Sequence, residues 1–269
     1  MISSRVERLR VGPYRLSRPL TRGPLAERWV AFHESDHSIH VAHRFKVAGA
    51  GPQVEAELAC AVASLASVSH PHILPVEGTV AGIAGSVWVI TPYSGNHDGL
   101  VTLASLAQAK GGRLTPPEAD RAMIQLLEAT GDAHEAGCHH GPVSADEVLI
   151  DRRGSLAVEL YGFRRRLTGL SARPAAEVAR DELRSIVEIG YTLITGLSAE
   201  EPRIEASRLF PRLDRRWDQW FADGLDPLGG FNSADEAMGA LPSHRRELEG
   251  RGSPVQTVIR RIQDALRPA

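Results

Sequence analysis

The chain has 269 residues, of which 42% are hydrophobic, so it is long enough to bury a substantial core as one large domain or two lobes. Its 31 lysines and arginines against 33 aspartates and glutamates give a net charge of −2, which excludes the strongly basic surface typical of a nucleic-acid-binding protein. Two cysteines, Cys60 and Cys138, have a spacing that fits neither a disulfide framework nor a zinc site. No apolar run of about 18 residues that would span a bilayer is found, and no signal peptide, so we expect a cytoplasmic protein without nucleic-acid or membrane partners.

Short apolar runs bounded by turn residues fill the first third of the chain and predict β-strands. A single helix is predicted among them, from about residue 53 to residue 68, and it ends before Pro71. The predicted strands cover residues 14–20, 26–33, 39–47, 73–79 and 86–93.

Helical periodicity replaces this pattern after about Thr102, which indicates a second lobe. Thr115, Pro116 and Glu118 form an N-terminal capping signal for a helix that runs to about Gly137. Further helices are predicted at 181–195, at 217–224 and between Ser233 and Pro242.

Three segments occur in the order and with the spacing of one known family. They are Ser69-His70-Pro71-His72-Ile73-Leu74, Val89-Ile90-Thr91-Pro92-Tyr93-Ser94-Gly95, and Ala133-His134-Glu135-Ala136-Gly137-Cys138-His139-His140. Over residues 14–241 the chain thereby resembles bacterial protein kinases of the Hanks type. The resemblance implies an α+β, protein kinase-like two-lobed fold, with a small antiparallel β-sheet N-lobe that carries one helix and a mainly helical C-lobe. We expect an N-terminal extension (1–13), an N-lobe (14–93), a C-lobe (94–242), and a linker with a C-terminal amphipathic helix (243–269).

The resemblance also marks a nucleotide site, which is degenerate in this chain. Gly23 is the one glycine kept from the family's glycine-rich loop, and Arg28 replaces a valine that covers the adenine. Arg44 matches the lysine that pairs with the phosphates, and Ala61 stands where its glutamate partner belongs, although Glu57 lies one turn earlier and is a possible substitute. Ala42 and Ile90 complete the degenerate site. We therefore expect no cofactor, with weak ATP binding left open.

The family's catalytic positions are degenerate as well. Pro142 replaces the catalytic aspartate, Ser144 replaces the loop lysine, and Glu147 replaces the metal-binding asparagine. Gly162 stands where the principal Mg²⁺-binding aspartate belongs, so no metal site is expected there.

The positions that support the family's fold are kept. Leu65, His140 and Phe163 match three stacked side chains that join the lobes, and Glu182 fits a carboxylate that anchors the catalytic-loop backbone. We expect Phe163 to contribute strongly to stability and Glu147 to contribute little. Histidine groups such as His37, His40 and His43 alternate faces on a predicted strand, which argues against a bound metal.

These observations predict a catalytically inactive protein kinase-like domain (a pseudokinase), not an enzyme, that acts as a protein-binding or regulatory scaffolding module in signalling. The alternative is an ATP-binding serine/threonine kinase-like enzyme with non-standard catalytic residues. We expect a protein partner, with a surface formed by Arg164, Arg165, Arg166, Val258, Ile259 and Ile262. The last three belong to an amphipathic stripe that packs on its own domain or binds a partner helix.

Overall fold

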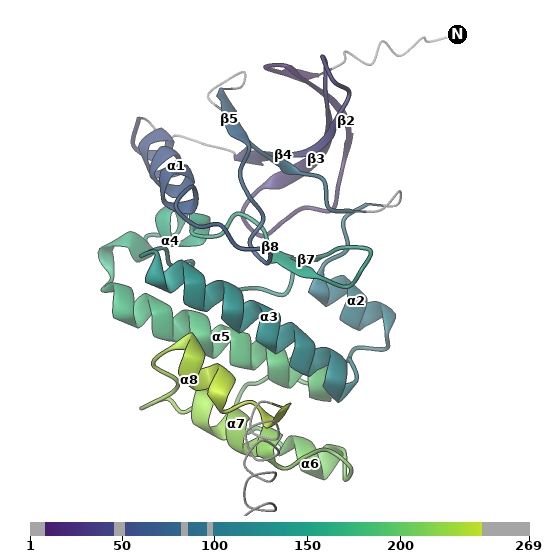
Figure 1. Ribbon diagram of the computed structural model, residues 1–269, viewed down its shortest axis with the longest axis vertical. Helices are drawn as coiled ribbons and strands as arrows, with labels where there is room; N and C mark the ends of the chain where they lie inside the picture. The colour runs from purple at the N-terminus through teal and green to yellow at the C-terminus, as the bar shows by residue number, and fades with distance from the viewer. Residues whose placement is uncertain (1–8, 46–51, 82–85, 96–98, 244–269) are drawn as a thin grey trace, which may run out of the picture.

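The computed structural model describes residues 9–45, 52–81, 86–95 and 99–243. A curled antiparallel sheet with one helix beside it lies above a larger helical lobe (Figure 1). The two-lobed α+β architecture expected from the sequence is therefore confirmed. The expected C-terminal helix, with Val258, Ile259 and Ile262, lies outside the described residues.

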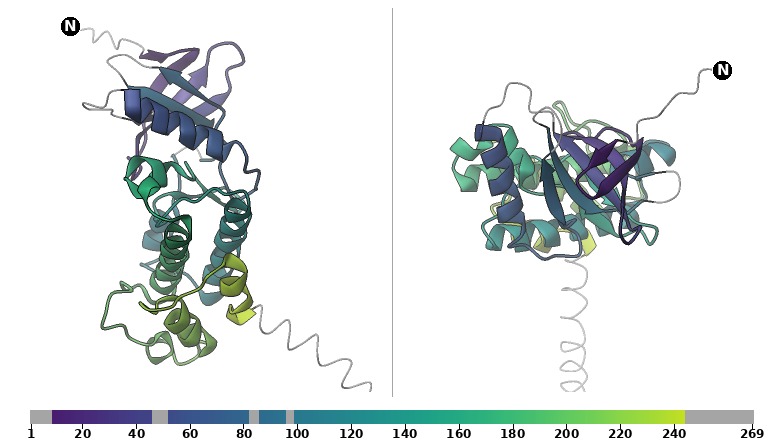
Figure 2. Two further views of the ribbon diagram at one scale, coloured as in Figure 1. Left: turned by 90° about the vertical axis from the view of Figure 1, so that its left-hand side faces the viewer. Right: turned by 90° about the horizontal axis from the view of Figure 1, so that it is seen from above.

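The N-lobe sheet has six strands in the order β1-β2-β3-β4-β6-β5. Its strands are β1 (Arg10–Val11), β2 (Tyr14–Pro19), β3 (Glu27–His33), β4 (Ile39–Phe45), β5 (Gly78–Ala81) and β6 (Val87–Pro92). Helix α1 (Pro52–Leu65) lies along one side of this sheet (Figure 2). Its Leu58 and Leu65 are buried in the core that continues into the helical lobe.

The register of the sheet decides which side chains point toward the helical lobe. Arg28 on β3 pairs with His43 on β4, and His43 pairs with Val89 on β6. Because successive side chains of a strand point to opposite faces, Ala42 and Arg44 lie on the other face from His43. Ala42 is buried there inside the curl of the sheet, in a small cluster separate from the main core.

The predicted strand at 73–79 is shorter than expected and begins only at Gly78. The residues before it pair with the C-lobe instead: Leu74 N–H donates to Val158 O at 2.9 Å, and Val158 N–H donates to His72 O at 2.9 Å. Pro75 follows directly and has no N–H to continue a ladder, so the chain leaves this pairing before β5 begins.

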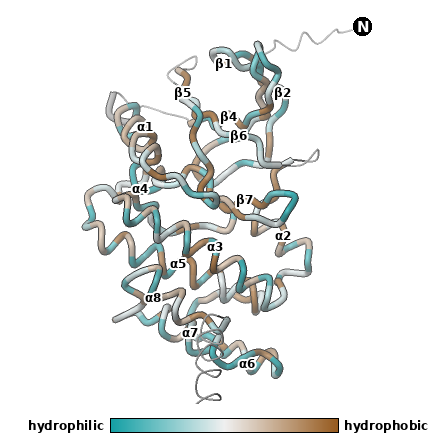
Figure 3. Tube along the Cα trace, viewed as in Figure 1, coloured by the Kyte–Doolittle hydropathy of each residue, from teal (hydrophilic) through white to brown (hydrophobic). Residues whose placement is uncertain are grey.

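The C-lobe is built around two long helices, α3 (Pro116–Glu135) and α5 (Ala175–Thr195), which pack against each other. Hydrophobic and hydrophilic residues alternate along both (Figure 3), as expected for helices with one buried face. Glu118 caps α3, because its carboxylate accepts the Thr115 N–H at 3.0 Å. The other elements are α2 (Leu103–Ala109), β7 (Val148–Ile150), β8 (Leu156–Val158), α4 (Phe163–Leu167), α6 (Ala206–Leu209), α7 (Arg216–Gly224) and α8 (Ala234–Gly239).

Helix α5 begins six residues before the predicted start at Asp181. Pro174 precedes its first turn, a position at which a fixed φ favours helix initiation. Arg173 then forms ion pairs with Glu177 at 3.4 Å and Asp181 at 2.6 Å. The added residues bury only Val178 and Ala179, which is too short an apolar stripe to indicate a helix by periodicity. In the described part of the chain, no helix has the length and hydropathy that a membrane span needs.

Candidate functional site

Arg28 reaches from the N-lobe across the space between the lobes. Only 2% of its surface is exposed, and its Nη2 donates to the backbone O of Asp146 at 2.9 Å and forms an ion pair with the Glu159 carboxylate. Glu159 and Asp146 both belong to the C-lobe. The guanidinium therefore lies in the interlobe cleft, in the space where the kinase resemblance places a nucleotide.

The cleft lowers the basicity of this arginine without neutralising it. Burial lowers the pKa of Arg28 to about 10, and the negative charges of Asp146 and Glu147 act in the opposite direction. Arg28 remains protonated at neutral pH, so the buried pair with Glu159 is an ion pair.

Gly23, the retained glycine of the loop before β3, packs directly against Arg28. A Cβ atom at position 23 would lie 2.8 Å from Arg28 Nε and 2.9 Å from Arg28 Cζ. The missing side chain thus makes room for the guanidinium of this chain.

The sheet does not bring the other predicted nucleotide-site residues to the cleft. Arg44 is on the opposite face, where it lies 3.8 Å from Glu27 and 5.7 Å over the Trp88 ring. Ala42 and Ile90 are buried in the cluster on that face. A difference of one residue in alignment accounts for this, since adjacent strand positions face opposite ways.

His43 of β4 faces the cleft and was not among the site residues predicted from the sequence. It is 1% exposed, and its Nε2 lies 2.9 Å from Thr91 Oγ1. Burial, followed by the positive charge of Arg28, lowers its pKa to about 3. The imidazole is therefore neutral. Strand alternation would have indicated which face the His43 side chain points to, but only if the register of β4 had been known.

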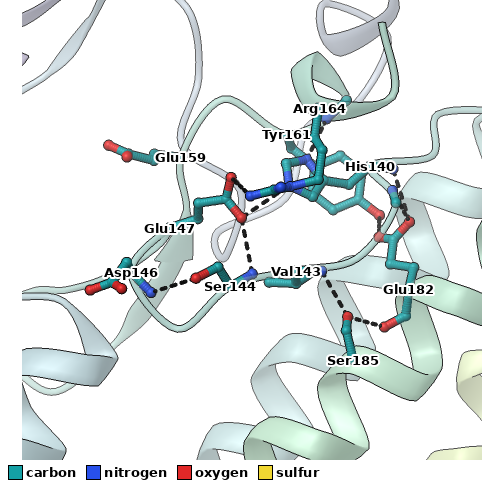
Figure 4. A network of polar contacts seen from close by, with 12 residues as sticks. His140, Val143, Ser144, Asp146, Glu147, Glu159, Tyr161, Arg164, Glu182 and Ser185 are labelled. Carbon is teal, nitrogen blue, oxygen red and sulfur yellow. Dashed lines mark hydrogen bonds and ion pairs between the residues drawn. The ribbon is translucent and has the colours of Figure 1, made fainter. Parts of the chain in front are cut away.

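The loop between α3 and β7 surrounds Glu147, which is 1% exposed (Figure 4). Its Oε1 accepts from Arg164 Nη2 at 2.7 Å, and its Oε2 accepts from Ser144 N–H at 2.9 Å. Burial opposes ionisation, but contacts with His140 and Arg164 lower the pKa of Glu147 overall. Both carboxylate oxygens of Glu147 therefore already accept hydrogen bonds from groups of the chain itself. These contacts lead us to predict that Glu147 contributes to stability, contrary to the expectation from the sequence.

His140 joins this loop to the turn before α4. The Gly162 N–H donates to His140 Nδ1 at 3.0 Å, and His140 Nε2 on the other side of the ring lies 3.5 Å from Glu147 Oε2. Phe163 next to it is fully buried and stacks on Phe45 of β4, with the ring centroids 5.8 Å apart. The Phe163 ring therefore connects α4 to the sheet.

Glu182 of α5 lies beneath the same loop and is fully buried. Its Oε2 accepts the backbone N–H of His140 at 2.8 Å and that of Gly141 at 3.1 Å. The Tyr161 hydroxyl donates to Oε1, and His134 Nε2 lies 3.2 Å from Oε2. Burial raises the pKa of Glu182, but these donors lower it overall. Glu182 was predicted from the sequence, whereas Tyr161 and His134 were not.

The remaining degenerate positions carry no group that would act on phosphate. Pro142 is exposed, and Ser144 Oγ accepts the Asp146 N–H at 3.3 Å. Gly162 has φ of +84°, and a Cβ atom there would lie 3.1 Å from Cys138 Sγ. Glycine suits this position because other residues rarely adopt such a backbone conformation.

The residues present do not fit Mg-ATP in the arrangement of the kinase family. Gly162 offers no carboxylate, Glu147 is occupied by Arg164 and Ser144, and the Arg28 guanidinium fills the cleft. Within the described ranges, no group of three or more His, Cys, Asp or Glu residues is arranged to hold a metal ion.

Two of the three arginines proposed as a partner surface are engaged inside the molecule. Arg164 binds Glu147, and Arg166 Nη1 lies 3.9 Å from Glu57 of α1. Glu57 therefore faces α4 and is not the partner of Arg44. The carbonyl of Arg165 accepts the Ser171 hydroxyl at 3.1 Å, and its side chain is half-buried.

A cavity of about 740 Å³ opens on the other side of the loop, between α2, residues 143–145 and α5. Apolar side chains such as Ala107, Val143 and Ile189 line it, and charged side chains surround them. Arg184 is paired with Glu188 at 3.2 Å, and Arg203 with Glu201 at 2.7 Å. The remaining acidic residue in the lining is Glu200.

The chain is similar in sequence to named protein kinases. The chain is 30% identical over 159 residues to CBL-interacting protein kinase 4 of Oryza sativa subsp. japonica, covering 57% of this chain and 33% of that protein. It is 25% identical over 211 residues to the serine/threonine-protein kinase PknG of Mycolicibacterium smegmatis, covering 68% of this chain and 26% of that protein. The chain thus spans about a third or less of these relatives. No protein-family model matches it.

Solved structures show the same fold. A double mutant of the Mycobacterium tuberculosis PknI kinase domain superposes with a TM-score of 0.72 at 17% identity, covering 88% of this chain and 98% of that one. The prediction that this chain is not an enzyme is contradicted by the comparisons, because its relatives are named protein kinases, a class of enzyme. The chain has the protein kinase fold and is similar in sequence to named protein kinases, one of them from a bacterium.

Proposed function

We propose that this kinase-fold chain is a regulatory signalling domain that acts by binding a segment of a partner protein. The observation that carries the proposal is the 740 Å³ cavity beside residues 143–145, which combines an apolar floor with a charged rim. Pockets of this size and mixed lining suit ligands with an apolar body and a few fixed polar groups. A peptide segment with aliphatic and basic side chains meets this description, since Glu188, Glu200 and Glu201 outnumber Arg184 and Arg203 on the rim.

Arg165 and the tail residues Val258, Ile259 and Ile262 remain part of the proposed surface. Arg164 and Arg166 contribute less, because their guanidiniums are paired with Glu147 and Glu57. A partner would therefore meet one arginine in this stretch rather than three.

The proposal is tested by filling the cavity. Thr192 lines it and is exposed on α5, so Thr192→Trp places a large side chain in the cavity without disturbing the core. Ala176→Trp is the matched control, because Ala176 is exposed on the same helix and does not line the cavity. Proteins cross-linked to the chain in its native cells are compared by mass spectrometry. A partner lost with Thr192→Trp and kept with Ala176→Trp supports the proposal, and one kept by both variants contradicts it.

A second candidate is phosphoryl transfer with non-standard residues, which the names of the relatives favour. Asp146 is the exposed carboxylate of the loop and would be the residue placed to meet an acceptor hydroxyl. Incorporation of labelled phosphate into a protein acceptor, with Mg²⁺ or Mn²⁺, that disappears in Asp146→Asn would establish this activity. Incorporation that is the same in both proteins would indicate a contaminating kinase.

A further inference from the structure

We propose that two arginines, Arg28 and Arg164, are built-in cations that hold the lobes closed without nucleotide or metal ion. Arg28 lies where the fold family would bind the nucleotide, and Arg164 neutralises Glu147 where the family would bind the metal. This inference concerns the interlobe cleft and is independent of the proposed protein-binding cavity.

Arg28 joins the lobes through one buried side chain. It starts on β3 of the N-lobe and ends on two C-lobe groups, the Asp146 carbonyl and the Glu159 carboxylate. Glu159 is 1% exposed, so the two charges compensate each other away from water. A movement of the lobes that separates the pair while one of the two charges stays buried is strongly unfavourable, because that charge would have no partner.

The short helix α4 provides the second connection, and Arg164 fixes this helix to the C-lobe loop. Its guanidinium binds Glu147 at 2.7 Å, while its neighbour Phe163 stacks on Phe45 of the N-lobe. Arg166 of the same helix approaches Glu57 of α1 at 3.9 Å. Helix α4 is thereby linked to the C-lobe loop on one side and to the sheet and α1 on the other.

A side-chain cation differs from a bound ion because it is attached to the chain. A chelator cannot remove it, and a guanidinium stays protonated throughout the physiological pH range. The burial of the Arg28 pair also limits screening by salt. Closure of the lobes is therefore independent of divalent ions and of added nucleotide.

The distance between the lobes provides a direct measurement. Cys60 is exposed on α1, whereas Cys138 is buried, and burial raises the pKa of its thiol to about 11. A spin label therefore attaches to Cys60 in preference to Cys138, and a second label is attached through Arg212→Cys on the exposed surface of the C-lobe. Electron–electron double resonance should give one narrow distance distribution, unchanged by EDTA or by Mg-ATP.

Removing the built-in cation should open the cleft. Arg28→Met keeps the unbranched apolar part of the side chain and removes its charged end, so the distance distribution should broaden and extend to longer distances. Arg44→Met is the control, because Arg44 lies on the opposite face of the same sheet and should leave the distribution unchanged. Glu159→Gln keeps the shape of the partner and should give the same broadening, and it decides the matter if Arg28→Met does not fold. An unchanged distribution in a folded Arg28→Met or Glu159→Gln protein overturns the proposal, as does a wild-type distribution that shifts with EDTA or Mg-ATP.

Discussion

His43 links the charge of the cleft to the stability of the protein. Its pKa of about 3 in the folded protein lies well below the value of about 6.5 that an unfolded chain gives. Between these values the unfolded state binds more protons than the folded state. Stability contributed by a neutral His43 is therefore complete above about pH 6.5 and is lost as the pH falls.

We predict that the free energy of unfolding decreases by about 1.4 kcal/mol for each pH unit below 6.5 on account of His43 alone. His43→Gln should flatten this dependence, because glutamine does not titrate. Urea unfolding between pH 4.5 and pH 7.5 provides the measurement. His37→Asn is the control, since His37 is exposed and asparagine tolerates its positive φ. An equal pH dependence of His43→Gln and wild type would show that His43 is accessible to protons in the folded state.

Glu147 and Arg164 form a pair whose partners depend on each other. We predict that Glu147→Gln destabilises the fold by about 3 kcal/mol, since it leaves Arg164 without its charge partner. Once Arg164→Met is present, the same change should cost at least about 1 kcal/mol less, because the two residues are in direct contact. Chemical denaturation of the two single variants and the double variant measures the difference. Strictly additive effects would mean that the ion pair contributes no coupling.

At the scale of elements, helix α4 connects parts that are far apart in the sequence. Its five residues place Phe163 against the sheet, Arg164 against the loop, and Arg166 against α1. A helix of this length has little stability of its own, so these contacts are what hold it in place.

We predict that Phe163→Ala destabilises the fold by about 3–5 kcal/mol, as truncation of a fully buried aromatic side chain does. Phe32→Ala should cost clearly less, because Phe32 is only half-buried on β3. Differential scanning calorimetry of both variants tests this. Similar losses in melting temperature for the two variants would remove Phe163 from its role between the lobes.

Part of the fold and of the candidate site could be predicted from the sequence. The longer strands and helices were predictable, because hydrophobic periodicity and the caps of α3 and α8 are local signals, whereas short elements such as α2, α4 and α6 were not predicted. Glu182 was recognisable from its place in the chain. Arg28 and Glu159 are 131 positions apart, and no local pattern pairs them. The direction of Arg44 could not be predicted, because a shift of one residue in strand register exchanges the two faces of a sheet.

For the whole molecule, the cleft determines the response to nucleotide. We predict that Mg-ATP binds with a dissociation constant weaker than about 10 µM, equivalent to about −7 kcal/mol, because it must displace Arg28 from Glu159 and Asp146. Isothermal titration calorimetry measures this, and Arg28→Val, which restores the valine of the resemblance, should bind an adenine nucleoside more tightly than wild type. Tighter binding to wild type than to Arg28→Val would show that the guanidinium attracts the ligand instead of excluding it.

Gly23 suggests one role in the sequence and has another in the folded protein. By the resemblance to protein kinases Gly23 matches a glycine of their phosphate-binding loop, yet in the folded chain Arg28 Nε and Cζ fill the space that a Cβ atom would take. Counting Gly23 as a retained nucleotide-binding residue would therefore be misleading, because this position accommodates Arg28, the side chain that competes with a nucleotide. Any side chain introduced at position 23 would push against Arg28, so a change that looks like the loss of a nucleotide contact would act as a wedge between the lobes.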